Sequence, residues 1–204
     1  MNRKEHVLLL ATRNPGKIEE IRLALEGLNV GIRTGIEMHG LPEVEETEET
    51  LDGNARLKAE TLFRWTGVPT LSDDTGLEVT VLGGDPGVRS ARFAGEPSNP
   101  AENRRLLLEK MKDASDRSAR FRTVMAFADD TGIHLFEGTC RGVITHAARG
   151  SGGFGYDSVF EPIGLDETFA EIDADTKNEI SHRGDALRQF VAFLRSHWQL
   201  EVGT

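Results

Sequence analysis

The segment from Val68 to Gly95 constrains the fold more than any other part of this chain. Residues 68–71 predict a buried strand, so Asp73 and Asp74 are expected at the end of that strand, followed by a short alternating run and a glycine-rich loop. Binding and catalytic groups of α/β proteins gather at such strand ends. Two carboxylates there indicate a hard cation such as Mg²⁺, bound through oxygen.

The sequence Asp-Asp-Thr-Gly is also typical of a turn, and it occurs twice, at Asp73–Gly76 and at Asp129–Gly132. The second copy lies between two strand-like runs and predicts the turn of a hairpin. The first copy is followed by the glycine-rich loop. For the first copy, a functional site and an ordinary turn both stay open.

Composition limits the class of protein. A length of 204 residues predicts a single domain over residues 1–204. The 34 acidic residues outnumber the 24 basic ones, and a net charge of −10 argues against broad electrostatic binding to nucleic acid or to an anionic membrane. The single cysteine, Cys140, excludes an internal disulfide and a cysteine-cluster metal site, which fits a reducing compartment.

The start of the chain does not predict a secretory signal. The apolar run at residues 7–11 is too short for a signal core, and no segment approaches the length of a membrane span. We therefore expect a soluble, cytoplasmic protein that binds neither membrane nor nucleic acid.

Residues 7–28 predict a strand, a tight loop and a helix. Asn14 can cap the helix, with Pro15 at its first position, and the free backbone N–H groups there could receive an anion. Lys17 in the first turn is unfavourable for the helix dipole, which makes sense if its ammonium group faces a phosphate. The alternative is a capped helix with a solvated lysine.

An acidic run at Glu43–Thr50 precedes a predicted helix over residues 51–63. Most such runs are solvated loops, although a metal site would use one or two of these carboxylates. Lys58 shares the expected buried stripe of the helix with Leu51, Ala55 and Leu62. It either snorkels to solvent or points into a polar cavity with an anionic occupant.

The glycine-rich loop at Gly150–Asp157 is a second candidate site. Its glycines allow a ligand to approach the backbone closely. Phe154 and Tyr156 could stack on a flat base, and Asp157 could accept hydrogen bonds from the edge of that base. The alternative is a flexible loop with one buried aromatic residue.

A compact basic group forms the third candidate, with Lys177 followed by His182 and Arg183. The last helix is expected over residues 181–198, so that His182 and Arg183 lie in its first turn, at an end that attracts anions. Together, the three segments indicate a nucleoside triphosphate site, with carboxylates for Mg²⁺, lysines for phosphates and aromatic rings for a base.

At this point the chain resembles the inosine triphosphate pyrophosphatase family, which removes non-standard purine nucleotides. Six motifs occur in the family's order, and together they are highly specific although each is weak alone. They are Thr12-x-Asn14-x-Gly16-Lys17, Asn54-Ala55-x-x-Lys58-Ala59, Asp73-Asp74-Thr75-Gly76-Leu77, Leu82-Gly83-Gly84-x-Pro86-Gly87 with Ser90-Ala91-Arg92, Gly152-Gly153-Phe154-Gly155-Tyr156-Asp157, and Ser181-His182-Arg183-Gly184.

The resemblance implies a mixed α/β fold with an elongated central sheet flanked by helices and two lobes around a nucleotide-binding cleft, as a homodimer. It implies Mg²⁺-dependent hydrolysis of dITP, ITP, XTP or dXTP to the monophosphate and pyrophosphate. Two alternatives stay open, a related pyrophosphatase for pyrimidine triphosphates and a nucleotide-binding module without catalysis.

The resemblance also implies residue roles. Asp74 activates water and is a metal ligand, and Glu46 is the other metal carboxylate. The groups on the phosphate side are Thr12, Asn14, Lys17, Lys58 and Lys177. The base pocket consists of Phe154, Gly155, Tyr156, Asp157, His182 and Arg183. Gly16 and Thr75 complete the predicted substrate-binding set, and Thr75 stands where serine is frequent in the family.

Overall fold

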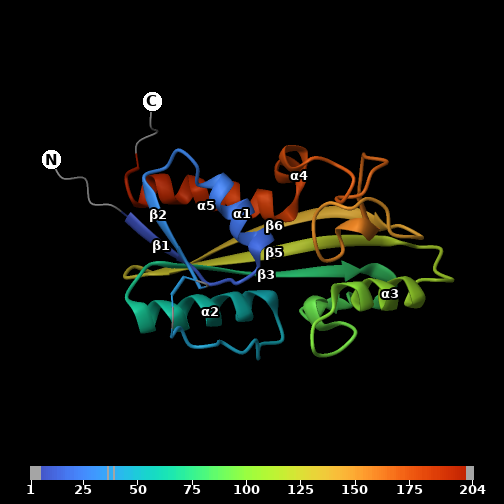
Figure 1. Cartoon of the computed structure of the whole chain (residues 1–204), viewed down its shortest axis with the longest axis horizontal. Helices are drawn as coiled ribbons and strands as arrows, with labels where there is room; N and C mark the ends of the chain where they lie inside the picture. Colours follow the sequence, from blue (N-terminus) through green and yellow to red (C-terminus); the bar gives the residue numbers. More distant parts are fainter. Residues whose placement is uncertain (1–5, 36, 39, 201–204) are drawn as a thin grey trace. The chain divides into compact units, whose positions relative to one another are not determined.

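The computed structural model describes residues 6–35, 37–38 and 40–200, and it shows a mixed α/β protein (Figure 1). The strands are β1 (His6–Leu10), β2 (Val30–Thr34), β3 (Thr70–Val79), β4 (Pro86–Gly87), β5 (Ser118–Asp129), β6 (Gly132–Ile144) and β7 (Phe160–Pro162). The helices are α1 (Pro15–Ala24), α2 (Leu51–Thr66), α3 (Pro100–Lys110), α4 (Ala174–Ile180) and α5 (His182–His197). Three short 3₁₀ helices are η1 (Thr80–Leu82), η2 (Ser90–Arg92) and η3 (Asp157–Val159).

Hydrogen bonds join these strands into a 7-stranded mixed sheet in the order β2-β1-β3-β5-β6-β7, with β4 paired to β3. Helices flank the sheet, so the predicted mixed α/β class with a mixed central sheet is confirmed. Among the described residues, no helix has both the length and the apolar character that crossing a membrane requires.

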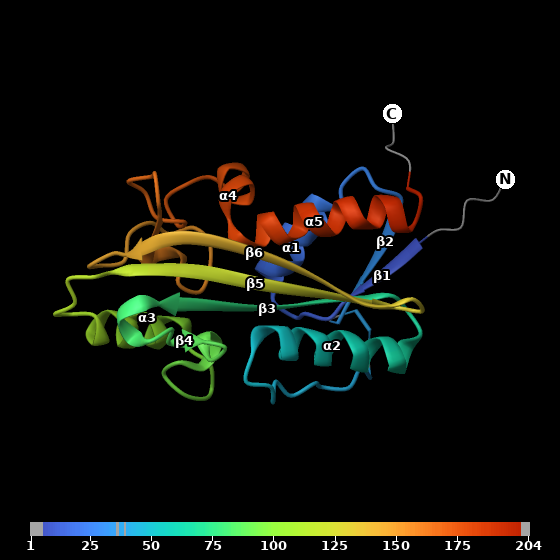
Figure 2. The ribbon, with the colours of Figure 1, turned by 180° about the vertical axis from the view of Figure 1, so that it is seen from behind.

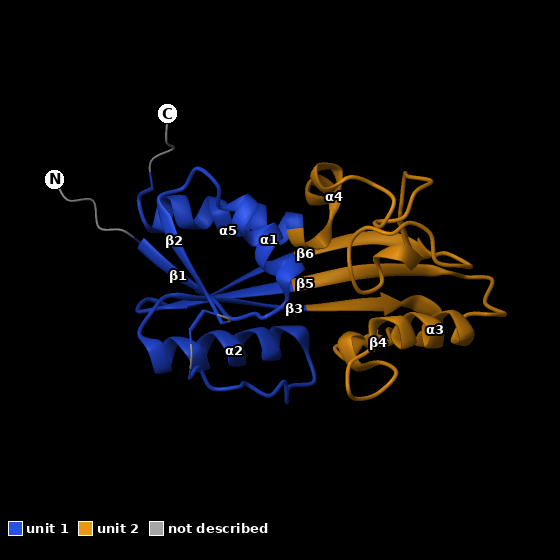
Figure 3. Cartoon of the chain, viewed as in Figure 1, with its two compact units in different colours: residues 1–74, 124–137, 184–204 blue, residues 75–123, 138–183 orange. Residues whose placement is uncertain are grey.

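The chain forms two compact units (Figure 3). Unit 1 comprises residues 1–74, 124–137 and 184–204, and unit 2 comprises residues 75–123 and 138–183. β3, β5 and β6 each contribute residues to both units, so neither unit is a continuous segment. The single domain over residues 1–204 and the nucleotide-binding cleft stay predictions.

In unit 1, β1 pairs in parallel with β2 and with β3, in a register that places Leu10 beside Thr34 and Leu71. The helices α1 and α5 cover one face of these strands, and α2 covers the other (Figures 1 and 2). Apolar side chains between the strands, α1 and α5 form a continuous core. Its buried members include Leu8, Leu10, Ile18, Ile21, Leu25, Leu71, Met125, Phe127, Phe136, Leu187, Phe190 and Leu194.

The helices of unit 1 begin as the sequence predicts. Asn14 caps α1, and Pro15 occupies its first position. Thr50 caps α2 by accepting a hydrogen bond from the Gly53 amide. This helix extends to Thr66, three residues beyond the expected end, and stops where Gly67 adopts a φ of +66°.

In unit 2, β4 pairs antiparallel with β3, and β7 pairs antiparallel with β6. The core lies between the strands, α3 and the segment that leads to α4. Its buried members include Leu77, Val79, Leu107, Met111, Phe121, Ile144, Tyr156, Val159, Phe160 and Phe169. A Cβ atom on Gly76 would lie 2.6 Å from the carbonyl oxygen of Gly87, so the approach of β4 to β3 requires glycine there.

The structure separates the two copies of Asp-Asp-Thr-Gly. The second copy forms the predicted hairpin turn, since β5 ends at Asp129 and β6 begins at Gly132. For the first copy, the predicted strand end and the predicted turn are both wrong, because Asp73 and Asp74 lie inside β3. The strand continues past them because Leu77 and Val79 are buried in the core of unit 2 and β4 pairs with this half.

Candidate functional site

The two adjacent carboxylates of β3 are buried in unit 1. The residues Asp73 and Asp74 are 2% and 6% exposed. A buried carboxylate requires a cation or hydrogen-bond donors close by, because its desolvation is otherwise costly. Both kinds of partner come from the first half of the chain.

Lys17 supplies the first cation. Its ammonium nitrogen lies 2.8 Å from Asp73 Oδ2. The Asn14 side chain fixes the start of α1 because its Oδ1 accepts hydrogen bonds from the amides of Gly16 at 2.9 Å and Lys17 at 3.4 Å. The Thr12 hydroxyl in turn accepts from the Asn14 amide. The predicted loop from Thr12 to Lys17 therefore holds an ammonium group beside the carboxylates.

Lys58 supplies the second cation and does not snorkel to solvent. Its ammonium nitrogen donates to Glu46 Oε1 and to the carbonyl oxygen of Asp73, both at 2.7 Å, and lies 3.9 Å from Asp74 Oδ1. Burial alone would lower the pKa of Lys58, but the carboxylates of Asp74, Glu46 and Asp73 outweigh burial and raise that pKa. The lysine is therefore held as a cation among three carboxylates.

The Asp74 carboxyl group has a strongly shifted acidity. Burial raises its pKa from 3.8 to about 6, and the negative charges of Glu46 and Asp73 act in the same direction, against the attraction of Lys58 and Lys17. A carboxyl group with a pKa near neutrality can accept a proton from water, as a general base must.

A cavity of about 250 Å³ opens beside this cluster in unit 1. Five of the residues that line it are Thr12, Lys17, Glu46, Lys58 and Asp73. Four of these belong to the predicted phosphate and metal groups. Within the described part of the chain, no group of three or more His, Cys, Asp or Glu side chains is arranged as a ready metal site.

In unit 2, Asp157 organises the predicted base loop. Its Oδ2 accepts hydrogen bonds from the Phe154 amide at 2.7 Å and from the Lys177 ammonium group at 2.9 Å. Gly153 has a φ of +66°, and a Cβ atom there would collide with the Asp157 carboxylate. Asp157 is 4% exposed, so it holds the shape of the loop from inside.

Two cations flank the ring of Phe154. Lys177 Nζ lies 4.8 Å and Arg183 Cζ lies 5.5 Å from the ring centroid. The family resemblance implies a place on the phosphate side for Lys177, and the structure places its ammonium group beside Phe154 and Asp157. The reason is the electrostatic attraction of Asp157, which the linear spacing of 20 residues does not reveal.

The other predicted base-pocket side chains are largely enclosed. Tyr156 is 5% exposed, and its hydroxyl donates to the Ser90 carbonyl oxygen at 2.8 Å, which matches the alternative of a buried aromatic residue. Burial raises the pKa of this phenol. The Gly155 carbonyl oxygen accepts a hydrogen bond from Arg104. The His182 ring is 3% exposed and stacks on Phe121 with centroids 4.5 Å apart.

Thr75 connects β3 to the basic group. Its hydroxyl lies 2.7 Å from the Thr123 hydroxyl and accepts a hydrogen bond from Arg183 at 3.1 Å. Arg183 is thereby held between Thr75 and the Phe154 ring. Thr123 is a contact that the sequence analysis missed, since an isolated threonine in a strand carries no signal.

The predicted residues thus form two clusters, one in each unit. Unit 1 contains the residues around the carboxylates, which are Thr12, Asn14, Gly16, Lys17, Glu46, Lys58 and Asp74. Unit 2 contains the residues around the aromatic loop, which are Thr75, Phe154, Gly155, Tyr156, Asp157, Lys177, His182 and Arg183. Sequence reasoning assigned no role to Asn54 or Arg104, although Asn54 lies in one of the quoted motifs.

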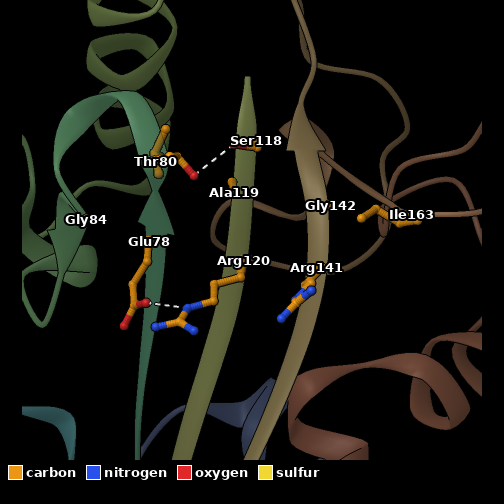
Figure 4. Close-up of a pocket in the computed structure, with 10 residues that line it drawn as sticks. Glu78, Thr80, Gly84, Ser118, Ala119, Arg120, Arg141, Gly142 and Ile163 are labelled. Atoms are coloured by element: carbon orange, nitrogen blue, oxygen red, sulfur yellow. Dashed lines mark hydrogen bonds and ion pairs between the residues drawn. The ribbon is translucent and has the colours of Figure 1, made fainter. Parts of the chain in front are cut away.

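A second cavity, of about 360 Å³, lies on the sheet of unit 2 (Figure 4). The side chains of Glu78 and Arg120 form an ion pair at 2.6 Å along its wall, and Arg141 lies on the neighbouring strand. None of the predicted site residues lines this cavity. This cavity is therefore separate from the residues of both clusters.

Comparisons with known proteins agree on one family. The model of the Ham1 family matches residues 8–193. A curated protein of Porphyromonas gingivalis, named dITP/XTP pyrophosphatase, is 50% identical over 194 residues, covering 92% of this chain and 96% of that protein. A protein of the same name from Bacillus licheniformis is 42% identical over 190 residues, covering 92% of this chain and 97% of that protein.

Solved structures show the same relationship. A HAM1 protein from Coxiella burnetii is similar with a TM-score of 0.87 and 37% identity, covering 94% of this chain and 99% of that chain. The Ham1 protein of Staphylococcus aureus is similar with a TM-score of 0.86 and 34% identity over the same shares.

Proposed function

The chain belongs to the Ham1 family, and we propose that it hydrolyses non-canonical purine nucleoside triphosphates to the monophosphate and pyrophosphate. The substrates are dITP, ITP, XTP and dXTP, and the reaction depends on Mg²⁺. One observation carries the proposal. Asp74 is a buried carboxyl group with a pKa of about 6 that lies 3.9 Å from the Lys58 ammonium group, next to the cavity that Lys58 and Asp73 line, in a relative of curated dITP/XTP pyrophosphatases.

The charges around Asp74 fit a divalent cation. Glu46, Asp73 and Asp74 are three carboxylates, whereas Lys17 and Lys58 supply two ammonium groups. A triphosphate adds further negative charge, so its approach requires additional positive charge. Glu46 and Asp74 both face the same ammonium group, and oxygen donors of this kind suit Mg²⁺. When bound, the ion would neutralise phosphate charge and help to orient water.

The chain's own residues divide the remaining work. Lys17 and Lys58 bind phosphate oxygens, and the amides at the start of α1 add hydrogen bonds. Asp74 takes the proton of the attacking water. Lys58 shares its ammonium group with Glu46 and Asp74, and it keeps the carboxylates from repelling one another before the substrate arrives.

The second cluster would recognise the base. The Phe154 ring offers a stacking surface, and Arg183 is held beside it by the Thr75 hydroxyl. Inosine and xanthosine carry an oxo group at position 6, which accepts hydrogen bonds from donors such as Arg183. Adenine carries an amino group at that position, so its N–H donor would face the N–H donors of Arg183 and no hydrogen bond would form between them.

A product assay tests the proposal. The protein is incubated with Mg²⁺ and dITP, XTP, dGTP, dATP or UTP, and pyrophosphate is separated from phosphate. Pyrophosphate from dITP and XTP, with little from dATP and UTP, supports the proposal, and the yield from dGTP measures whether the 2-amino group of guanine is refused separately. Pyrophosphate mainly from UTP would assign the protein to the pyrimidine alternative. Bound nucleotide without turnover would leave the binding module.

We further propose a cytoplasmic homodimer, which rests on the family resemblance. Light scattering during gel filtration would give twice the mass of the 22.4 kDa chain. A mass of one chain at micromolar concentration would overturn the dimer.

A further inference from the structure

Asn54 is a fully enclosed polar residue near the carboxylates, with an exposure of 0%. It lies in the first turn of α2, one turn before Lys58 and on the same face. It is not among the residues proposed to bind the metal ion or the phosphates. Its amide nevertheless contacts both segments that carry the predicted metal carboxylates.

Three hydrogen bonds define these contacts. Asn54 Oδ1 accepts from the Glu48 amide at 2.9 Å, and Nδ2 donates to the Glu48 carbonyl oxygen and to Asp74 Oδ2, both at 3.3 Å. A backbone N–H can only donate, so the oxygen of the amide must face Glu48 N. The NH₂ group therefore faces Asp74, and the orientation of the amide is fixed by its partners.

The acidic segment is also pressed against α2 at this point. A Cβ atom on Gly53 would lie 2.6 Å from Glu48 Cβ, so the close approach requires glycine. Two residues before Glu48, Glu46 reaches Lys58 on the next turn of the helix. The segment is thus attached to α2 at two successive turns. The Asn54 side chain binds the backbone of Glu48, and the Lys58 ammonium group binds the side chain of Glu46.

We propose that Asn54 is a positioning residue that fixes the Asp74 carboxylate and the segment carrying Glu46 relative to each other. This inference rests on the proposed hydrolysis. A single side chain that binds both segments sets the separation of the two carboxylates before a metal ion or substrate arrives. Groups that orient metal ligands affect activity by about 10- to 100-fold when they are removed.

The chain offers a matched control in unit 2. Asn103 lies on α3 and is 3% exposed. Its Oδ1 accepts from the Ala94 amide at 2.7 Å, and its Nδ2 donates to the carbonyl oxygen of Ala91 at 2.8 Å. Like Asn54, it attaches a loop to a helix from a buried position, but it contacts no carboxylate in the described structure. Asn103→Ala therefore reports the purely structural cost of losing such an amide.

The experiment compares Asn54→Ala, Asn54→Asp and Asn103→Ala with the unmodified protein. For each, kcat and KM for dITP with Mg²⁺, the Tm, and hydrogen exchange at the Glu48 amide of the metal-free protein are measured. Asn54→Asp keeps an acceptor for the Glu48 amide but loses the donor to Asp74. It therefore separates the two contacts, and it also serves if Asn54→Ala does not fold.

We expect kcat to fall about 10- to 100-fold in both Asn54 variants, with KM changed less than about threefold. The Glu48 amide should exchange at least about tenfold faster in Asn54→Ala and stay protected in Asn54→Asp. Asn103→Ala should lower the Tm with kcat within about twofold of the unmodified value.

Two results would overturn the inference. In one, Asn54→Ala loses Tm as Asn103→Ala does and keeps its kcat, which makes Asn54 merely structural. In the other, Asn54→Asp keeps full kcat, which removes the contact with Asp74 from the reaction. Unchanged hydrogen exchange at the Glu48 amide in Asn54→Ala would show that Asn54 does not hold the acidic segment on α2. An unmodified protein that releases no pyrophosphate from dITP would instead overturn the proposed function.

Discussion

The two copies of Asp-Asp-Thr-Gly have the same four residues but different partners. In the first copy, Asp73 and Asp74 are buried inside β3 and face two lysines. In the second, Asp129 is also buried but begins a hairpin turn whose residues 130–132 are exposed, and its Oδ1 accepts hydrogen bonds from the Thr131 amide and hydroxyl. Groups far away in the sequence therefore determine what the tetrapeptide does.

The carboxyl groups of the two copies also differ in acidity. Burial dominates at Asp74 and raises its pKa to about 6. At Asp129, burial alone would also raise the pKa, but hydrogen bonds from Thr131 and His197 outweigh it and lower the pKa below 3.8. The negative charge of Asp74 is thus unfavourable in the folded state, whereas the negative charge of Asp129 stabilises the hairpin turn.

The largest expected effect concerns turnover. Asp74→Asn should lower kcat for dITP by about 10²- to 10⁴-fold, because an amide cannot take a proton from water. The matched variant in the second copy, Asp130→Asn, changes an exposed residue of the turn and should leave kcat unchanged. Steady-state kinetics measure both. Full activity in Asp74→Asn would show that Asp74 is not the base.

The glycines of the two copies are needed for different reasons. A Cβ atom on Gly76 would meet the backbone of Gly87 at 2.6 Å, so Gly76→Ala must displace β4 and should cost about 3 kcal/mol or more. Gly132 has open space around it but a φ of +128°, so Gly132→Ala should cost about 1–2 kcal/mol of strain. Urea unfolding measures both losses. Equal losses would show that β4 yields to the added methyl group.

The pH dependence of stability should have opposite signs in the two copies. The folded-state pKa of Asp74 lies above 3.8, so stability falls as the pH rises from 3.8 to about 6. Asp74→Asn removes this cost and should stabilise the metal-free protein by up to about 3 kcal/mol at pH 8, with no gain near pH 4. Urea unfolding in EDTA at the two pH values measures this. A gain of equal size at both would assign the effect to packing.

The comparison also shows how much the sequence could predict. The Asn14 cap, the start of α2 and the hairpin at Asp129 depend on local chemistry, and the structure confirms them. The course of β3 through Asp74 could not be predicted from local turn preference, because burial of Leu77 and pairing with β4 override it.

The site shows the same division. Glycine, carboxylate and lysine motifs pointed to the residues that form both clusters, and the family resemblance implied the roles that are proposed for them. The partners of these residues were not predictable, since Lys177 pairs with Asp157 and Lys58 with Glu46 only through the tertiary fold. Asn54 shows this most clearly, because a buried asparagine within a helix gives no sequence signal for the two segments that it joins.

The smallest expected effect sharpens the contrast between the copies. Asp129 Oδ2 lies 2.6 Å from His197 Nε2 at the end of α5, and Asp129→Asn keeps the acceptor for Thr131 but loses the charge. The lowered pKa means that this charge stabilises the fold above pH 3.8 and that the benefit disappears as the pH falls through that pKa. Asp129→Asn should therefore cost about 1 kcal/mol at pH 7 and progressively less in acid, with kcat unchanged. Urea unfolding across this pH range tests the sign, and a cost that stays constant with pH would show that the amide geometry, not the charge, holds the turn.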